Sequence, residues 1–343
     1  MKEKIFITGG AGYIGSHVAK QLLEQGEEII IVDNLSTGSQ KILDILYAIK
    51  PFEFINLDLN AFDEISKLLH EKHIETILHF AASIVVPESV SNPLKYYMNN
   101  TVNTTHLIQA AINANVKKFI FSSTAAVYGE PTEIPENGVD ETFPTKPINP
   151  YGMSKLMSEK ILADTAKANP EFKYIVFRYF NVAGADIEVP SPRIGQCFDK
   201  ATHLIKVASE CAIGKRESMS IFGDDYATPD GTGVRDYIHV DDLARAHIDA
   251  IAYLDTHESD IFNVGYGKGY SVKEVIQTMR DVTGNDIQAT AGARRAGDPA
   301  TLIANTSKII SKMKWHPKYN DLNLICKSAY IWEKMMFRRS SDE

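Results

Sequence analysis

Tyr151 and Lys155 are the two residues of this 343-residue chain whose types and spacing most directly suggest acid–base chemistry. They stand four positions apart in Tyr151-Gly152-Met153-Ser154-Lys155, so a helix would place both on one face. A free tyrosine has a pKa near ~10, which is too high for a base at neutral pH. An ammonium group about 5 Å away would favour the phenolate by roughly 3 kcal/mol at an effective dielectric constant near 20. We therefore predict that Lys155 lowers the pKa of Tyr151, although such pairs also arise by chance on many helices.

Hydroxyl side chains form a second group, Ser122-Ser123-Thr124, directly after an apolar run that begins at Lys118. In a doubly wound sheet the carboxyl ends of the strands face the ligand. We expect Thr124 to bond a substrate oxygen there and to share its proton with Tyr151. Hydroxyl residues also form turns, and for the two serines that alternative stays open.

A glycine-rich segment near the start predicts a dinucleotide site. It reads Thr8-Gly9-Gly10-Ala11-Gly12-Tyr13-Ile14-Gly15, between an apolar run and an amphipathic stretch. Glycines permit positive φ and close backbone approach, and the N–H groups that open a helix face an anion. Gly9, Gly12 and Gly15 differ by one residue from the common fingerprint, so the spacing alone is a modest signal.

Asp33 strengthens this prediction and selects the cofactor. It ends the next apolar run, 18 residues after Gly15, where a carboxylate would accept hydrogen bonds from an adenosine ribose. A carboxylate repels a 2′-phosphate, and no arginine lies between Asn34 and Gln40 to neutralise one. NAD is therefore favoured over NADP, and its cationic nicotinamide would further favour the phenolate of Tyr151.

These residues need a regular framework. Strands are expected at about 4–8, 28–33, 52–56, 76–80, 118–122 and 173–180, and helices at about 13–25, 39–49, 61–72, 93–115 and 151–169. Strands rich in Ile, Val and Phe that alternate with helices indicate βαβ units and a parallel sheet covered on both faces. The expected fold class is α/β, with a doubly wound, Rossmann-type sheet.

The alternation ends after Gly184, where Gly and Pro divide the chain into short pieces. Residues 234–240 and 261–264 are expected to be strands, and their return to the first domain is left open. We expect a NAD-binding domain of residues 1–181 plus about 235–262. A smaller C-terminal α/β lobe of about 182–234 plus 263–343 would bind the substrate.

Composition limits the partners. A formal net charge of −8 argues against nucleic acid and anionic membranes. No run of 18 apolar residues exists, and a first strand at about Lys4 leaves no room for a signal peptide. Cys197, Cys211 and Cys326 have neither metal nor redox spacing, so we expect a metal-free, cytoplasmic protein.

The glycine turn, the hydroxyl-rich strand end and the Tyr-x-x-x-Lys pair resemble an extended short-chain dehydrogenase/reductase. Longer strings narrow the resemblance to the UDP-glucose (UDP-galactose) 4-epimerase family and cover nearly the whole chain. They are Gly12-Tyr13-Ile14-Gly15-Ser16-His17, Asp33-Asn34-Leu35, Arg178-Tyr179-Phe180-Asn181, Ile221-Phe222-Gly223-Asp224-Asp225-Tyr226 and Asp230-Gly231-Thr232-Gly233-Val234-Arg235-Asp236-Tyr237-Ile238-His239-Val240.

The resemblance implies a role for each matched residue. Around NAD it places Gly9, Gly12, Tyr13, Ile14, Gly15, Asp33, Asn34, Asp58, Leu59, Phe80, Ala81, Asn99, Tyr151, Lys155 and Tyr179. Around the UDP-sugar it places Thr124, Tyr151, Asn181, Leu204, Phe222, Arg235, Arg295 and Asp298. Thr124 and Tyr151 would address the sugar 4-hydroxyl. Two arginines suit a doubly anionic diphosphate, although either could be a solvated surface charge.

Three positions depart from the family pattern. Ile84 stands where many relatives have a lysine, which puts one cofactor contact in doubt. His203 replaces an asparagine before Leu204; it could donate to the substrate or simply be a packed core histidine. Leu302 replaces a tyrosine at the wall near the sugar C2 substituent, so we expect the pocket to admit N-acetylated sugars as well.

The implied activity is reversible C4 epimerisation of UDP-hexoses in galactose and other carbohydrate metabolism. Tyr151 removes the 4-hydroxyl proton while C4 passes a hydride to NAD, and the 4-keto sugar turns over and takes the hydride back. A dehydratase or decarboxylase of the same superfamily would need acid or base groups where Ala125 and Ala126 stand. A net dehydrogenase would release NADH, and a non-catalytic NAD sensor would not need both Tyr151 and Lys155.

Assembly is implied as well. The helices expected at 93–115 and 151–169 carry Leu107, Ile108, Ala111, Leu156 and Ile161. In the family such helices pair across a two-fold axis into a four-helix bundle, which predicts a homodimer. The alternative, that these residues only face the sheet, stays open.

Overall fold

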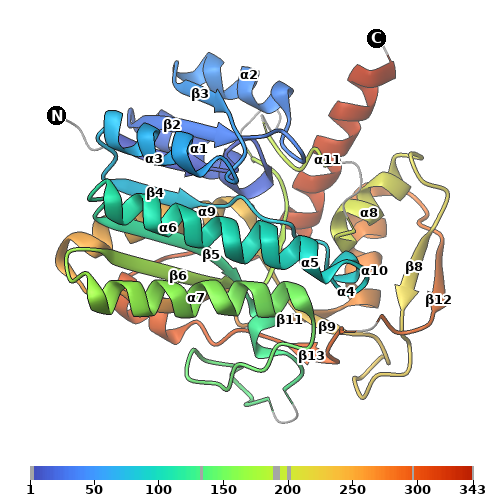
Figure 1. Cartoon of the computed structure of the whole chain (residues 1–343). Coiled ribbons are helices and arrows are strands. Elements are labelled where there is room, and N and C mark those ends of the chain that lie inside the picture. Colours follow the sequence, from blue (N-terminus) through green and yellow to red (C-terminus); the bar gives the residue numbers. More distant parts are fainter. Residues whose placement is uncertain (1–3, 132–133, 188–193, 199–201, 296, 342–343) are drawn as a thin grey trace.

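A seven-stranded parallel sheet lies at the centre of the computed structural model, which describes residues 4–131, 134–187, 194–198, 202–295 and 297–341 (Figure 1). Its strands, in spatial order, are β10 (Asp260–Val264), β6 (Lys173–Tyr179), β5 (Lys118–Thr124), β4 (Thr76–His79), β1 (Lys4–Thr8), β2 (Glu28–Asp33) and β3 (Glu53–Asn56). Every neighbouring pair is parallel. The predicted doubly wound α/β class is confirmed, because the order reverses between β1 and β4.

Helices cover both faces of this sheet. On one face lie α1 (Tyr13–Glu24), α2 (Gln40–Ile49) and α9 (Val240–Thr256), and on the other α3 (Phe62–Glu71), α6 (Asn103–Asn113) and α7 (Pro150–Ala168). Side chains alternate along the strands, so that neighbouring residues pack into the hydrophobic layers on opposite faces of the sheet. Ile5 and Ile7 of β1 pack beneath the first set of helices, whereas Phe6 packs beneath the second.

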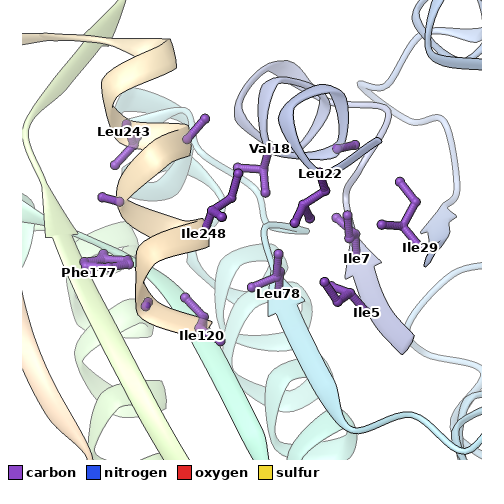
Figure 2. Close-up of a cluster of buried hydrophobic side chains, with 14 of the residues drawn as sticks. Ile5, Ile7, Val18, Leu22, Ile29, Leu78, Ile120, Phe177, Leu243 and Ile248 are labelled. Carbon is purple, nitrogen blue, oxygen red and sulfur yellow. The ribbon is translucent and has the colours of Figure 1, made fainter. Parts of the chain in front are cut away.

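Figure 2 shows the first layer, where Val18 and Leu22 of α1 meet Ile248 of α9 above the sheet. Helix α9 therefore packs beside α1, although more than two hundred residues separate them in sequence. The helix that begins at the glycine turn is thus held by a late segment of the chain.

The single helix expected over 93–115 is wrong. The chain forms α4 (Val86–Ser91), α5 (Pro93–Tyr96), a π-helical turn η1 (Tyr97–Val102) and then α6. In η1 the amide of Asn100 bonds the backbone of Ser83 and the hydroxyl of Ser154. A π-turn accommodates one extra residue, and such turns often occur at functional sites.

The rest of the chain forms two small sheets and their helices. One sheet contains β7 (Asn181–Ala183), β9 (Val234–His239), β11 (Gly269–Ser271) and β13 (Thr301–Leu302), and the other β8 (Met219–Phe222) and β12 (Ala289–Gly292). Around them lie α8 (Leu204–Ala212), α10 (Val272–Thr283), η3 (Ile309–Met313) and α11 (Leu322–Ser341), and the short turn η2 (Ala125–Tyr128) follows β5.

The segment expected to return to the first domain divides between the sheets. Strand β9 pairs with β7, β11 and β13 in the small sheet, while α9 and β10 belong with the large one. The division into two lobes stays a prediction, and residues 188–193, 199–201 and 296 of the second lobe lie outside the described residues.

Candidate functional site

A cavity of about 890 Å³ opens at the carboxyl ends of the large sheet and extends to the small sheets. The predicted residues that line it are Gly9, Gly12, Tyr13, Ile14, Gly15, Asp33, Asn34, Asp58, Leu59, Phe80, Ala81, Asn99, Thr124, Tyr151, Tyr179, Asn181, His203, Leu204, Phe222, Arg235, Arg295, Asp298 and Leu302. Lys155 is the predicted site residue that does not line the cavity, because it is buried behind Tyr151. The fold thus brings residues from every part of the chain to one space.

The glycine turn makes a backbone cradle at one end of the cavity. Gly9 has φ of +71°, and a Cβ there would lie 2.7 Å from the backbone N of Ala81. A Cβ on Gly15 would lie 2.3 Å from the carbonyl oxygen of Gly9. No side chain caps the start of α1 at Gly12. The turn therefore presents uncapped N–H groups to the cavity, which suits the pyrophosphate of a dinucleotide.

Asp33 links the end of β2 to this cradle. Its carboxylate accepts hydrogen bonds from the backbone N–H groups of Ala11 at 3.0 Å and Leu35 at 2.8 Å. Burial raises the pKa of Asp33, while these two bonds oppose the rise. The side chain also lines the cavity, so its remaining acceptor positions fit a ribose hydroxyl. The geometry at the carboxyl ends of β1 and β2 therefore fits NAD.

Helix α7 places Tyr151 in its first turn. Asn149 caps the helix by accepting a bond from Gly152 N at 2.8 Å, and Pro150 occupies the first helical position. Tyr151 thus sits where the helix dipole favours negative charge. From β5, Thr124 shares a hydrogen bond with the phenol and lowers its pKa, although burial outweighs this and raises the pKa overall.

The predicted effect of Lys155 on Tyr151 is wrong for the protein alone. The ammonium of Lys155 donates to the carbonyl oxygen of Ser122 at 2.9 Å and lies 4.9 Å from the centre of the Phe121 ring. Burial lowers the pKa of Lys155 to about 7, so its charge is itself partly lost near neutral pH. Desolvation therefore controls both groups, an effect that the i, i+4 spacing does not reveal.

The π-turn η1 separates two neighbouring asparagines. Asn99 lines the cavity and donates to the Ser83 hydroxyl at 3.0 Å. Asn100 is buried and donates to Ser154 Oγ at 3.1 Å, next to Lys155 on α7. The turn thus supports the cofactor wall on one side and the helix of Tyr151 on the other.

Two arginines stand at the far end of the cavity. Arg235 projects from β9 and donates to the carbonyl oxygens of Val234 and Ala300 at 2.9 and 3.3 Å. The guanidinium of Arg295 lies 3.7 Å from the centre of the Phe222 ring. Burial lowers the pKa of Arg295, and Asp298 opposes that shift. Neither arginine is a freely solvated charge, and together they suit a diphosphate.

The three departures from the family pattern all line the cavity. His203 precedes α8, and its Nδ1 lies 3.0 Å from the amide nitrogen of Gln196. Burial and the charge of Lys206 lower the pKa of His203. Ile84 is exposed, whereas Leu302 is buried against the apolar cluster that contains Val139 and Phe180.

Several lining residues escaped sequence reasoning, among them Asn149, Arg216, Ser220, Tyr237 and Val272. The Asn149-Pro150 pair before a helix is a capping signal that could have located the first of them. The others belong to short pieces of the second lobe whose tertiary placement no local pattern indicates.

Across the described ranges, no group of three or more His, Cys, Asp or Glu side chains is arranged to hold a metal ion. Among the helices that the structure describes, none combines the length and apolar character that a membrane span requires.

Known proteins of similar sequence share this site's framework. Residues 5–265 match the model of the NAD dependent epimerase/dehydratase family. A UDP-glucose 4-epimerase from Azospirillum brasilense is 44% identical over 334 residues, which cover 97% of this chain and 92% of that protein. One from Lacticaseibacillus casei is 45% identical over 333 residues, with 96% of each covered.

Solved structures agree. The UDP-Glc/GlcNAc 4-epimerase of Campylobacter jejuni superposes with a TM-score of 0.84 at 56% identity, covering 97% of this chain and 99% of that one. The UDP-glucose 4-epimerase of Bifidobacterium longum in complex with NAD+ and UDP superposes with a TM-score of 0.91 at 37% identity, covering 97% and 98%. By sequence and by fold, this chain belongs to the NAD-dependent epimerase/dehydratase family.

Proposed function

We propose that the chain interconverts UDP-glucose and UDP-galactose by inverting C4 of the sugar, with NAD as its cofactor. One observation carries the proposal: Thr124 and Tyr151 meet at the middle of a cavity whose two ends differ in chemistry. One end is a backbone cradle for a dinucleotide, and the other holds Arg235 and Arg295 for a diphosphate. Relatives named for this activity match over nearly their whole length.

The chain's own groups divide the work. Gly9, Gly12 and Gly15 hold the pyrophosphate of NAD, and Asp33 holds its ribose. When bound, NAD supplies a reversible acceptor for the hydride of C4. Tyr151 takes the proton of the 4-hydroxyl and returns it, and the Thr124 hydroxyl orients that oxygen. Lys155 supplies a positive charge behind Tyr151 while it is protonated, and burial opposes this by lowering its pKa.

The alanines of η2 argue against the rival chemistries of the superfamily. Ala125 and Ala126 line the cavity directly after Thr124. A 4,6-dehydratase or a decarboxylase needs a further acid or base beside the hydroxyl, and methyl groups cannot transfer protons. The site therefore suits proton transfer at the sugar 4-hydroxyl, and the two positions directly after Thr124 offer no further acid or base.

Incubation of the purified protein with UDP-galactose tests the proposal. We expect UDP-glucose to appear with many turnovers per protein, without added cofactor and without accumulation of NADH. Denaturation of the purified protein should release NAD. Steady NADH release would instead indicate a net dehydrogenase, and the absence of conversion would overturn the proposal.

We further propose that UDP-GlcNAc and UDP-GalNAc are substrates. Leu302 forms part of the cavity wall, and a leucine leaves space that a tyrosine would fill. The structure of the similar Campylobacter jejuni protein is described as that of a UDP-Glc/GlcNAc 4-epimerase. An overfilled pocket costs about 1–3 kcal/mol, which is enough to exclude an acetamido group.

We also propose that the chain forms a homodimer and is located in the cytoplasm. Of the five residues on which the dimer was predicted, Leu107, Ile108, Ala111 and Leu156 are buried in the core of the single chain, and Ile161 is partly buried against it. The same helical layer does expose Val90, Leu94, Met98 and Met157. A symmetric pairing would cover them. Cys211 and Cys326 are buried and form no disulfide with any residue that the structure describes, which suits a reducing compartment.

Light scattering at micromolar concentration tests the dimer. We expect a dimer for the wild-type chain and a monomer for Leu94→Asp with Met98→Asp. A wild-type monomer would contradict the dimer.

A further inference from the structure

A buried ion pair continues the Tyr151–Lys155 face of α7 by one further turn. Glu159 of α7 and Arg178 of β6 are 3% and 5% exposed. Arg178 Nε lies 3.1 Å from both carboxylate oxygens of Glu159, and its Nη2 lies 2.6 Å from Oε2. The pair therefore has the two-pronged geometry that gives the strongest carboxylate–guanidinium contacts.

Glu159 completes a regular series of contacts between α7 and β5, which lies against it in the fold (Figure 1). Tyr151 bonds Thr124, and one turn later Lys155 donates to the Ser122 carbonyl oxygen. A further turn along, Glu159 accepts from the Ser123 hydroxyl. Positions i, i+4 and i+8 of the helix thus all bind the last three residues of the strand, in the order Thr124, Ser122 and Ser123.

Arg178 anchors this series to the rest of the protein. Its Nη1 donates to Tyr128 Oη at 3.2 Å and to the Glu141 carbonyl oxygen at 3.3 Å. Tyr128 Oη in turn donates to Asn263 Oδ1 of β10 at 2.7 Å. The guanidinium also lies 5.1 Å from the centre of the Tyr128 ring. The ion pair consequently joins α7, β5, β6, η2 and β10.

Such a pair is an unexpected means of stabilising a core. Removing two charges from water is costly, and well-packed apolar residues of similar size are often as stabilising or more so. A role beyond stability is therefore worth seeking in what the carboxylate faces. On its own helix, Glu159 shares a face with Lys155 and acts on that ammonium through its charge.

Glu159 is the charged group that favours the protonated form of Lys155. Among the described residues, the titratable groups that interact with it are Glu159 from α7 and His79 from β4, while Phe121 from β5 offers only its ring. Burial keeps His79 neutral by lowering its pKa to about 3. Burial likewise lowers the pKa of Lys155, and Glu159 acts in the opposite direction.

We propose that Glu159, fixed by Arg178, is a positioning residue for the epimerase: it sets the register of α7 on β5 and keeps Lys155 charged behind Tyr151. The proposal rests on the proposed epimerase activity. Loss of the carboxylate would move Tyr151 relative to Thr124 and remove charge from Lys155 at neutral and alkaline pH. Both changes act on the chemical step rather than on the distant diphosphate site.

Glu159→Gln and Glu159→Asp test the proposal, after the wild-type chain has been shown to convert UDP-galactose. For the glutamine variant we expect kcat to fall about tenfold or more with little change in KM. The alkaline limb of its kcat–pH profile should move to lower pH, because an uncharged neighbour lets Lys155 lose its proton earlier. The aspartate variant keeps the charge, so its alkaline limb should stay near that of the wild type.

A double variant separates this role from simple stabilisation. Glu159→Gln leaves Arg178 buried without its partner and so lowers stability. Glu159→Met combined with Arg178→Met removes both charges at similar volume and should recover stability. We expect the double variant to remain slow, with a displaced alkaline limb. Recovery of wild-type kcat and pH profile together with stability would overturn the proposal, as would an unchanged profile in folded Glu159→Gln.

Discussion

The two ends of the cavity are built in different ways. The cofactor end consists of the carboxyl ends of adjacent parallel strands, and its main groups come from two short motifs, the glycine turn after β1 and Asp33 at the end of β2. The nucleotide-sugar end collects Asn181, Leu204, Phe222, Arg235 and Arg295 from separate short pieces. A shared sheet edge positions the first set, whereas long-range packing must position the second. Substitutions at the two ends should therefore affect different steps.

Tyr151 lies between the two ends, and its removal should have the largest effect. Tyr151→Phe deletes the group that accepts the proton and keeps the ring that packs against Tyr96. General-base catalysis commonly contributes ~10²–10⁴ in rate, so we expect kcat to fall by that factor. Bound NAD, measured after denaturation, should stay the same. Activity within a few-fold of the wild type would remove Tyr151 from the proposed chemistry.

Arg295 tests the nucleotide-sugar end alone. A hydrogen bond to a charged group contributes about 1.5–3 kcal/mol, so Arg295→Met should raise KM for UDP-galactose about ten- to hundredfold. Its NAD content should not change. Arg294→Met is the matched control, because that exposed neighbour pairs with Asp225 at 2.7 Å and does not line the cavity. Equal effects of the two variants would contradict the assigned diphosphate site.

A substitution of Leu302 tests how the same end of the cavity selects between plain and N-acetylated sugars. Leu302→Tyr fills the wall, and a strain of about 1–3 kcal/mol should lower kcat/KM for UDP-GalNAc by roughly 5–150-fold. The value for UDP-galactose should change much less, so the ratio of the two is the quantity to measure. The idea fails if the wild type has no N-acetyl activity, or if the tyrosine variant keeps all of it.

A buried histidine of the large sheet should also make the free energy of unfolding slightly dependent on pH in the acidic range. His79 of β4 is buried between the hydroxyls of Thr8 and Thr104, and its pKa is lowered from 6.5 to about 3. Between these values the unfolded chain binds a proton that the folded chain does not, so the free energy of unfolding falls as the pH falls.

Urea unfolding at several pH values between 7 and 4 measures this dependence. His79→Gln removes the titrating group and should give a shallower slope than the wild type. Two other buried histidines, His239 and His247, also have a pKa lowered to about 4, so a residual slope is expected. Identical slopes would show that His79 does not contribute.

Sequence patterns were sufficient for the framework and the cofactor end. Continuous apolar runs predict the strands because both faces of the sheet are buried, and the predicted class, family, enzyme type and cofactor are confirmed. The glycine turn and Asp33 are local, so chain order already places them together. Arg235 and Arg295 entered through family resemblance, since nothing in their own surroundings indicates a shared cavity.

Two predictions omitted tertiary effects, besides the single helix over 93–115, which the structure divides. The spacing of Tyr151 and Lys155 places them on one face but says nothing of desolvation, which raises the pKa of the tyrosine and lowers that of the lysine. Apolar residues such as Leu107 and Ile108 suggested an interface, yet they face the sheet. The exposed apolar residues of this layer are Val90, Leu94, Met98 and Met157. The homodimer, the cytoplasmic location and the individual residue roles stay predictions.

Because of the π-turn η1, the structure between β4 and α6 depends on the number of residues in that segment as well as on their types. Within Tyr97–Val102, Asn99 faces the cavity and Asn100 faces Ser154, which lies on the helix of Tyr151. Deleting one residue there would convert the turn to a regular α-helix and rotate one flank against the other by about 100°. Asn99 could then no longer face the cavity while Asn100 contacts Ser154. A substitution in this turn removes one contact, whereas a deletion of a single residue would detach the cofactor wall from the helix that holds the base.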